Sequence, residues 1–175
     1  MRPWTLTEID QALRASFAAD TCSPDDFARA GWHQDNPSWG HCDVTALVVN
    51  DLLGGDLVVG EVHHGGEHIC YHWWNRLPNG VELDLTREQF VHDEVVSGAR
   101  VVHRPPGPLP HRWAEYLLLR ERLTARLGPL PAPAGSTPEG QGPVPAAGSS
   151  PGHLPPTTTT AGRSNTVKSR SGSDG

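Results

Sequence analysis

Residues 42–53 read Cys-Asp-Val-Thr-Ala-Leu-Val-Val-Asn-Asp-Leu-Leu, and the pair Gly54-Gly55 follows them. Apolar side chains recur on every turn of this stretch, which predicts a largely buried helix that begins at Cys42. The two glycines end the helix, because glycine readily adopts the backbone conformation that follows a helix C-terminus. Strand patterns begin directly afterwards, so this stretch marks the change from helices to strands.

Two shorter helices are expected before the buried one. Thr5-Leu6-Thr7-Glu8 has the spacing of a capping box, and Ser23-Pro24-Asp25-Asp26 places proline and two acids in a first helical turn. Strands are expected at residues 56–62, 69–77, 81–85 and 100–103, a short helical turn at 86–89, and a last amphipathic helix at 110–127. Helices followed by antiparallel strands indicate an α+β fold.

The composition excludes several classes of protein. The chain has 175 residues, with 14 Lys and Arg against 20 Asp and Glu. No apolar run approaches the ~20 residues of a membrane span, and no basic stripe marks a nucleic-acid partner. Three cysteines do not form a disulfide framework, and no signal peptide is recognisable, so a cytoplasmic protein is expected.

The chain divides into two parts by composition. Residues 1–127 contain every aromatic residue and carry 11 Lys and Arg against 18 Asp and Glu, which indicates one acidic folded domain. Residues 128–175 are rich in Pro, Gly, Ser, Thr and Ala and contain no aromatic residue. Such a segment buries too little apolar surface to offset its ordering entropy, so we expect a disordered tail.

Cys42 is the first candidate for chemistry. At a helix N-terminus, the free N–H groups and the helix dipole lower the pKa of a thiol and can hold a developing oxyanion. The alternative is a small buried residue that packs the helix start, since free cysteine is usually buried and inert.

The segment Leu77-Pro78-Asn79-Gly80 favours a tight turn between two strands. As a three-residue loop, it pairs Leu77 with Val81 and places His72 and Asp84 on the same face as diagonal neighbours. A two-residue Asn-Gly loop would place these two side chains on opposite faces. The prediction that His72 meets Asp84 therefore depends on the turn.

A thiol at a helix start, a histidine on a strand and an acid on the next strand can act as nucleophile, base and orienting group. Cys42, His72 and Asp84 are our candidates for these roles. In the alternative interpretation, Asp84 only caps the turn at Thr86 and His72 is a half-buried residue of the sheet.

Three blocks of this sequence resemble a bacterial family called YunG-like. These blocks are Asn36-Pro37-Ser38-Trp39-Gly40-His41-Cys42-Asp43-Val44-Thr45-Ala46-Leu47-Val48-Val49, His72-Trp73-Trp74-Asn75-Arg76-Leu77 with Gly80, and Asp84-Leu85-Thr86-Arg87-Glu88-Gln89-Phe90. Their ordered Cys, His and Asp are similar to those of papain-like hydrolases, which include NlpC/P60 peptidases and transglutaminase-like proteins. The resemblance implies a papain-like α+β fold, with the cysteine helix packed on a small antiparallel sheet.

The resemblance also bears on the surroundings of the cysteine. The family usually has Gln directly before it, where this chain has His41, so His41 is the candidate oxyanion donor in place of that Gln. Trp39 and Trp74 are candidates for substrate binding, with core packing as the alternative for both.

A metal site is the other chemistry that the sequence offers. His68, Cys70 and His72 alternate onto one face of a strand, and imidazole and thiolate are the usual zinc ligands. No recognised zinc spacing is present, and His63-His64 adjoin a Gly-Gly turn where exposure is expected. No cofactor is predicted.

The leading hypothesis is therefore a cysteine-dependent acyl-transfer enzyme acting on a peptide, amide or small-molecule acyl substrate. Amide or isopeptide hydrolysis, deamidation and transamidation all fit the hypothesis. One alternative is a non-catalytic metal- or ligand-binding module built on the His- and Cys-rich strand. Another is an interaction protein whose tryptophan-rich loop contacts a partner. The sequence does not specify an oligomeric state.

Overall fold

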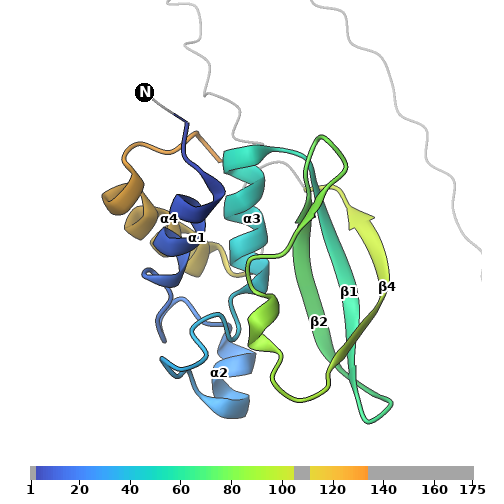
Figure 1. Cartoon of the computed structure of the whole chain (residues 1–175). Helices are drawn as coiled ribbons and strands as arrows, with labels where there is room; N and C mark the ends of the chain where they lie inside the picture. Colours follow the sequence, from blue (N-terminus) through green and yellow to red (C-terminus); the bar gives the residue numbers. More distant parts are fainter. Residues whose placement is uncertain (1–2, 105–110, 134–175) are drawn as a thin grey trace, which may run out of the picture. The chain divides into compact units, whose positions relative to one another are not determined.

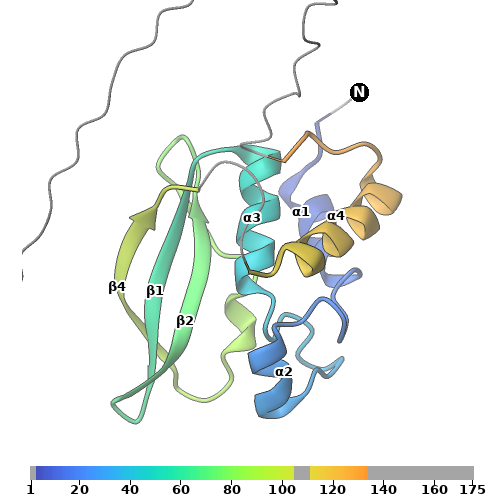
Figure 2. The same ribbon diagram turned by 180° about the vertical axis from the view of Figure 1, so that it is seen from behind.

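Helix α3 (Cys42–Leu53) lies between a helical layer and a sheet in the computed structural model, which describes residues 3–104 and 111–133 (Figure 1). Helices α1 (Leu6–Arg14) and α4 (Trp113–Leu127) pack on the side of α3 that faces away from the sheet (Figure 2). Helix α2 (Pro24–Ala30) lies near the start of α3. The bounds of α3 agree with those expected from its apolar pattern.

The predicted helix starts are confirmed by their capping contacts. The Thr5 side chain accepts a hydrogen bond from the Glu8 amide at 3.2 Å, and the Glu8 carboxylate accepts one from the Thr5 amide at 2.8 Å. Ser23 accepts a longer hydrogen bond of 3.4 Å from the Asp26 amide in front of α2. These contacts satisfy amides that have no partner inside the helix.

The sheet has four antiparallel strands in the order β3-β2-β1-β4. Their bounds are β1 (Asp56–His64), β2 (Glu67–Arg76), β3 (Glu82–Leu83) and β4 (Val95–Val102). The sequence predicted all four strands but started the last one at Arg100. Ser97 and Gly98 are poor strand formers, and pairing of this segment with β1 outweighs their propensity.

The hairpin between β2 and β3 has the predicted register. The Leu77 amide donates to the Val81 carbonyl at 2.8 Å, and strand pairing joins Asn75 to Leu83. Gly80 adopts a φ of 85°, which completes the three-residue loop. This register places His72 and Asp84 on one face of the sheet.

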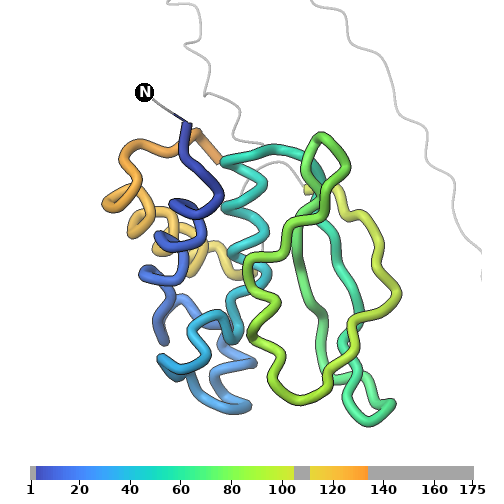
Figure 3. The backbone as a smooth tube through the Cα atoms, viewed as in Figure 1, coloured from blue at the N-terminus to red at the C-terminus, as the bar shows by residue number. Residues whose placement is uncertain are grey.

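The chain crosses from one edge of the sheet to the other between β3 and β4, as the tube in Figure 3 shows. A short 3₁₀ helix, η1 (Arg87–Gln89), lies on this connection where a helical turn was expected. The Thr86 side chain does not cap it. Instead the Thr86 amide and hydroxyl donate to Asp84 Oδ1 at 3.1 and 3.3 Å, so Asp84 holds the turn.

The hydrophobic core lies between α3 and its neighbouring helices, with Leu57 of β1 at its sheet side. The main buried side chains are Ile9, Leu13, Phe17, Val44, Leu47, Val48, Val49, Tyr116, Leu119 and Leu123. Leu130 also packs against this core, although the sequence assigned it to the tail. The rest of the predicted tail, residues 134–175, lies outside the described residues. Within the described ranges, no helix has the length and apolar character needed to cross a membrane.

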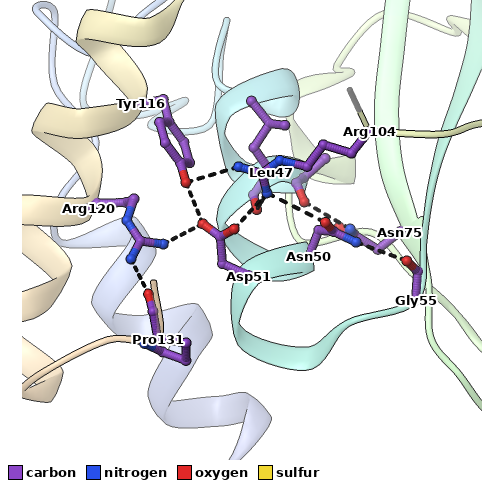
Figure 4. Close-up of polar contacts among 10 residues, drawn as sticks. Leu47, Asn50, Asp51, Gly55, Asn75, Arg104, Tyr116, Arg120 and Pro131 are labelled. Carbon is purple, nitrogen blue, oxygen red and sulfur yellow. Dashed lines mark hydrogen bonds and ion pairs between the residues drawn. The ribbon is translucent and has the colours of Figure 1, made fainter. Parts of the chain in front are cut away.

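A buried charge cluster joins α3 to α4 and to the residue Arg104 beyond β4 (Figure 4). The Asp51 side chain is fully buried and accepts hydrogen bonds from Arg104 at 2.6 Å, from Tyr116 at 2.5 Å and from Arg120. Burial and the Asp51 carboxylate raise the pKa of Tyr116 to about 12. Arg104 also donates to the Leu47 carbonyl at 3.0 Å, which ties this cluster to the helix backbone.

The observed arrangement confirms the α+β class. Helix α3 packs mainly against β2, so the first residues of α3 lie beside the strand that carries His72. This contact positions the candidate site.

Candidate functional site

His72 and Asp84 form the polar centre of the sheet face that was predicted to carry them. His72 Nε2 donates to Asp84 Oδ2 at 2.7 Å, and the histidine is only 1% exposed. The other carboxylate oxygen of Asp84 accepts from Thr86, as described above. Asp84 thus holds the turn and binds His72 at the same time.

Gln89 is the third member of this cluster, and the sequence did not single it out. Its side-chain amide nitrogen lies 3.0 Å from His72 Nδ1. Because a carboxylate only accepts hydrogen bonds, Nε2 of His72 carries the proton and Nδ1 accepts from Gln89. The main-chain carbonyl of Gln89 accepts a hydrogen bond from the Asn36 side chain at 3.0 Å. In the sequence, Gln89 belongs to the expected helical turn at residues 86–89 and to the family-like block 84–90, and neither indicated a contact with His72.

Aromatic rings enclose His72. Trp74 stacks on the imidazole with ring centroids 5.6 Å apart, and Phe90 meets it edge-on at 4.8 Å. Gly60 makes room for the indole, since a Cβ at this position would lie 3.0 Å from the Trp74 ring and 2.8 Å from Val96. The close packing fixes the orientation of the imidazole.

An open pocket of about 360 Å³ lies against this cluster. Its lining residues are His72, Trp74, Glu82, Asp84, Arg87, Val96 and Ala99. Trp74 Nε1 donates to the Glu82 carboxylate at 2.9 Å, so the indole is held at the pocket wall. Trp74 therefore packs on His72 and lines the pocket with the same side chain.

Cys42 lies at a different pocket, also of about 360 Å³, between α2, the start of α3 and β2. Its lining residues are Ser23, Asp25, Asp26, Arg29, Cys42, Asp43, His68, Ile69, Cys70, Tyr71, Trp73 and Arg112. The Cys42 thiol is free and 9% exposed. The backbone N–H of Trp73, the residue directly after His72, bonds to its sulfur.

The surroundings of Cys42 keep its thiol protonated. Burial raises the pKa of Cys42 strongly, and the nearby Asp43 carboxylate raises it further. The Trp73 amide opposes this shift without cancelling it. Desolvation therefore acts against the thiolate that was expected at a helix N-terminus.

The structure thus joins two of the three residues predicted to act together. His72 binds Asp84, but both ring nitrogens of His72 are occupied, Nε2 by Asp84 and Nδ1 by Gln89. The Cys42 thiol meets the backbone of the neighbouring residue Trp73 instead of the imidazole.

Arg112 anchors the start of α3 to the start of α4. It donates to both carboxylate oxygens of Asp43 at 3.1 Å and to the Thr21 carbonyl at 2.9 Å. Arg112 has a φ of 62°, a conformation that is unfavourable for a residue with a side chain. No sequence pattern indicated this contact, since the two partners lie far apart in the chain.

His41, the candidate oxyanion donor, directs both of its ring nitrogens to partners inside the protein. The ring is fully buried, with Nδ1 donating to the Trp39 carbonyl at 2.8 Å and Nε2 lying 2.9 Å from the Thr21 hydroxyl. Burial lowers the pKa of His41 to about 4, so the ring is neutral. With both nitrogens bonded inside the protein, His41 stabilises the loop before α3.

Trp39 also lies apart from Cys42. Its indole N–H donates to the Asp26 carbonyl at 3.2 Å, and its ring lines a third pocket of about 280 Å³. Gly40 separates it from the helix start with a φ of 68°, and a Cβ there would lie 2.6 Å from the Cys22 sulfur. The loop therefore turns the indole away from the pocket that holds the thiol.

The three residues of the metal hypothesis do not line one common pocket. Within residues 3–104 and 111–133, no group of three or more His, Cys, Asp or Glu side chains is arranged to hold a metal ion. His72 lines one pocket, whereas His68 and Cys70 line the other. His64 of the same hairpin bonds to the His92 carbonyl at 2.9 Å.

Comparison with known proteins settles the family. The family model described as YunG protein matches residues 5–128, which is most of the chain. The chain belongs to the YunG family. A curated relative, "Uncharacterized protein YunG" from Bacillus subtilis (strain 168), is 41% identical over 59 residues. That alignment covers 34% of this chain and 46% of the relative, which is under half the relative's length.

No solved structure matches this YunG-family chain. The family name carries no activity, so a function has to be argued from the side chains described above.

Proposed function

We propose that this YunG-family domain is a cysteine-dependent acyl-transfer enzyme of papain-like arrangement. Cys42 is the nucleophile, His72 the base and Asp84 the group that orients the imidazole. Amide or isopeptide hydrolysis, deamidation and transamidation are the reactions that such a group supports. A reducing cytoplasm suits the chemistry, because the thiol has to stay reduced.

The hydrogen bond between His72 and Asp84 carries the proposal. It fixes the tautomer in which Nε2 bears the proton, and it leaves the lone pair of Nδ1 as the base. A buried imidazole held by a carboxylate at a pocket wall is the arrangement that general-base chemistry requires.

The position of Cys42 supports the same proposal. The thiol begins α3 and contacts the backbone of Trp73, one residue after His72. The first N–H groups of a helix have no partner within it, so they can bind an oxyanion that forms at a carbonyl attacked by the sulfur.

The reaction begins when the Cys42 thiol replaces the Gln89 amide at Nδ1 of His72. The thiol proton moves to Nδ1, and the sulfur attacks the substrate carbonyl to form a tetrahedral intermediate. Collapse of the intermediate breaks the carbon–nitrogen bond, the departing amine takes the proton from His72, and a thioester on Cys42 remains. Water or a second amine then attacks the thioester and releases the thiol.

The test is acylation of the full chain by p-nitrophenyl acetate, with the modified cysteine located by mass spectrometry. We expect an acetyl thioester on Cys42, and the rate should fall at least ~100-fold in His72→Ala, which is the usual contribution of general-base catalysis. His103→Ala is the control, since it removes an exposed histidine that lines neither the Cys42 pocket nor the His72 pocket. Acylation of Cys42 that is unchanged in His72→Ala would contradict the proposal.

A non-catalytic ligand-binding module is the second candidate, and the burial of the Cys42 thiol with its raised pKa favours it. In that case the pocket beside His72 and Trp74 holds the ligand and no covalent step occurs. No acylated Cys42 would form with the activated ester, and Cys42→Ala would leave ligand binding unchanged.

A further inference from the structure

One edge of β2 continues beyond its strand partner. Strand β3 pairs with β2 only at Asn75 and Arg76. The N–H and C=O groups of a strand point alternately to its two sides. The Leu77 amide points toward β3, because it bonds to the Val81 carbonyl, so every second residue before Leu77 points the same way. The main-chain groups of Asn75, Trp73 and Tyr71 therefore all point toward the β3 side.

The contact at Cys42 agrees with this alternation. The Trp73 N–H, which the alternation directs outward, is hydrogen-bonded to the Cys42 thiol and not to a strand. At Tyr71 the outward N–H and carbonyl have no strand partner among the described residues. An unpaired strand edge of this kind is a template for another extended backbone.

The pocket that holds Cys42 runs along this edge. Ile69, Tyr71 and Trp73 of β2 form one wall, and residues 23–29 around α2 form the opposite wall. Cys42, Asp43 and Arg112 complete the lining. A volume of about 360 Å³ lies in the range of small-ligand sites, so it admits a short extended segment and excludes a folded domain.

Two exposed apolar side chains flank the edge. Ile69 is 41% exposed and Tyr71 is 51% exposed. In strand addition, main-chain bonds give affinity, and side chains of this kind pack against the alternate residues of the bound segment.

The charges of the pocket favour a basic segment. Arg112 binds Asp43, and Arg29 lies 3.6 Å from Asp26, so both guanidinium groups are neutralised by carboxylates. Asp25 then gives the pocket a net negative charge. An acidic pocket attracts a lysine- or arginine-bearing ligand and repels an acidic one.

We propose that the outer edge of β2 at Tyr71 binds an extended, basic polypeptide segment as an added strand, in the pocket that leads to the Cys42 thiol. This inference rests on the proposed function in naming that segment as the substrate. Binding of the segment requires no catalysis, so strand addition at Tyr71 can be disproved without disproving acyl transfer by Cys42, and the reverse.

The experiment uses the full chain carrying Cys42→Ala, which binds but cannot turn over a peptide. The probe is acetyl-Lys-Val-Lys-Val-amide, titrated into ¹⁵N-labelled protein. We expect the amide resonances of Tyr71 and its neighbours to shift and hydrogen exchange at Tyr71 to slow. A matched probe replaces the central Val-Lys amide with an ester, which removes one N–H donor. Its affinity should fall ~10-fold, the value of one well-placed hydrogen bond.

Two further comparisons sharpen the result. Tyr71→Pro removes the outward N–H and should lower the affinity ~10-fold, whereas Tyr71→Phe keeps it and should bind as before. Acetyl-Glu-Val-Glu-Val-amide should bind more weakly than the lysine probe. If Tyr71→Pro does not fold, the proposal is still tested by comparing the amide and ester probes on the chain that keeps Tyr71. Equal affinity for the amide and the ester, or shifts confined to the His72 pocket, would overturn the proposal.

Discussion

The side-chain amide of Gln89 lies 3.0 Å from Nδ1 of His72, the ring nitrogen opposite the one that Asp84 holds. This nitrogen is the one that has to accept the thiol proton in the proposed reaction. Gln89 therefore competes with Cys42 for the imidazole, and it holds the described structure in a state where base and nucleophile are unpaired. Whether the Gln89 amide occupies Nδ1 of His72 should therefore control how fast the Cys42 thiol reacts.

We expect Gln89→Ala to increase the rate at which iodoacetamide alkylates Cys42 at pH 7 at least ~10-fold, because a freed imidazole promotes thiolate formation. Mass spectrometry reads each cysteine separately, and Cys70 serves as the internal standard. Gln11→Ala, on the exposed face of α1, is the control and should leave the rate unchanged. An unaltered rate in Gln89→Ala would show that Gln89 does not hold the thiol and imidazole apart.

Asp43→Asn should shift alkylation of Cys42 to lower pH. The Asp43 carboxylate is one cause of the raised pKa of this thiol, and Arg112 would keep its positive charge after the substitution. Both effects favour the thiolate. The measurement is the pH profile of the alkylation rate, and Asp35→Asn in the exposed loop should leave the profile in place. A shift to higher pH would contradict the prediction.

His41 should make the protein less stable in mild acid. Burial lowers its pKa to about 4 in the folded protein, against ~6.5 in an unfolded chain. Between these values the unfolded chain binds a proton that the folded protein does not, so the free energy of unfolding falls as the pH falls. The loss should total about 3 kcal/mol across this window.

Chemical denaturation at pH 7 and pH 4.5 tests this expectation. His41→Gln removes the titrating group, so its free energy of unfolding should change less between the two pH values than that of the unsubstituted chain. His92→Gln, at an exposed position, should keep the full difference. Equal pH dependence in His41→Gln and the unsubstituted chain would exclude His41 as the source.

Asp51→Asn should destabilise the domain by about 3–5 kcal/mol, because it leaves two buried guanidinium groups without their shared carboxylate. Asp56→Asn is the matched control. Asp56 forms an exposed pair with Arg76 at 3.5 Å, which is worth under about 1 kcal/mol. The free energy of unfolding from denaturant titration should separate the two variants clearly, and similar values would contradict the role of Asp51.

Local patterns predicted most of the secondary structure. The capping residues Thr5 and Ser23 and the apolar run from Cys42 each act over a few residues, so the sequence shows them directly. The turn at Pro78-Asn79-Gly80 fixed the strand register, and the contact between His72 and Asp84 followed from it.

The remaining contacts depend on packing between distant segments. Gln89 reaches His72 because the connection after β3 folds back against the sheet, and no local pattern encodes this path. The pKa of Cys42 depends on how completely its surroundings exclude water, which the helix-start pattern does not report. The role of oxyanion donor was assigned to His41 because it directly precedes Cys42, but its ring is directed toward Thr21.

The Asp51 cluster constrains how sequences of this fold can diverge. One carboxylate serves Arg104 and Arg120 together, so replacing the acid leaves two guanidinium groups without their partner in the interior, whereas replacing one arginine still leaves a matched pair. Loss of the acid alone is therefore the unfavourable first step when this cluster changes. A relative that lacks the acid is expected to lack the two bases as well, so position 51 should covary with positions 104 and 120 even though they are far apart in the chain.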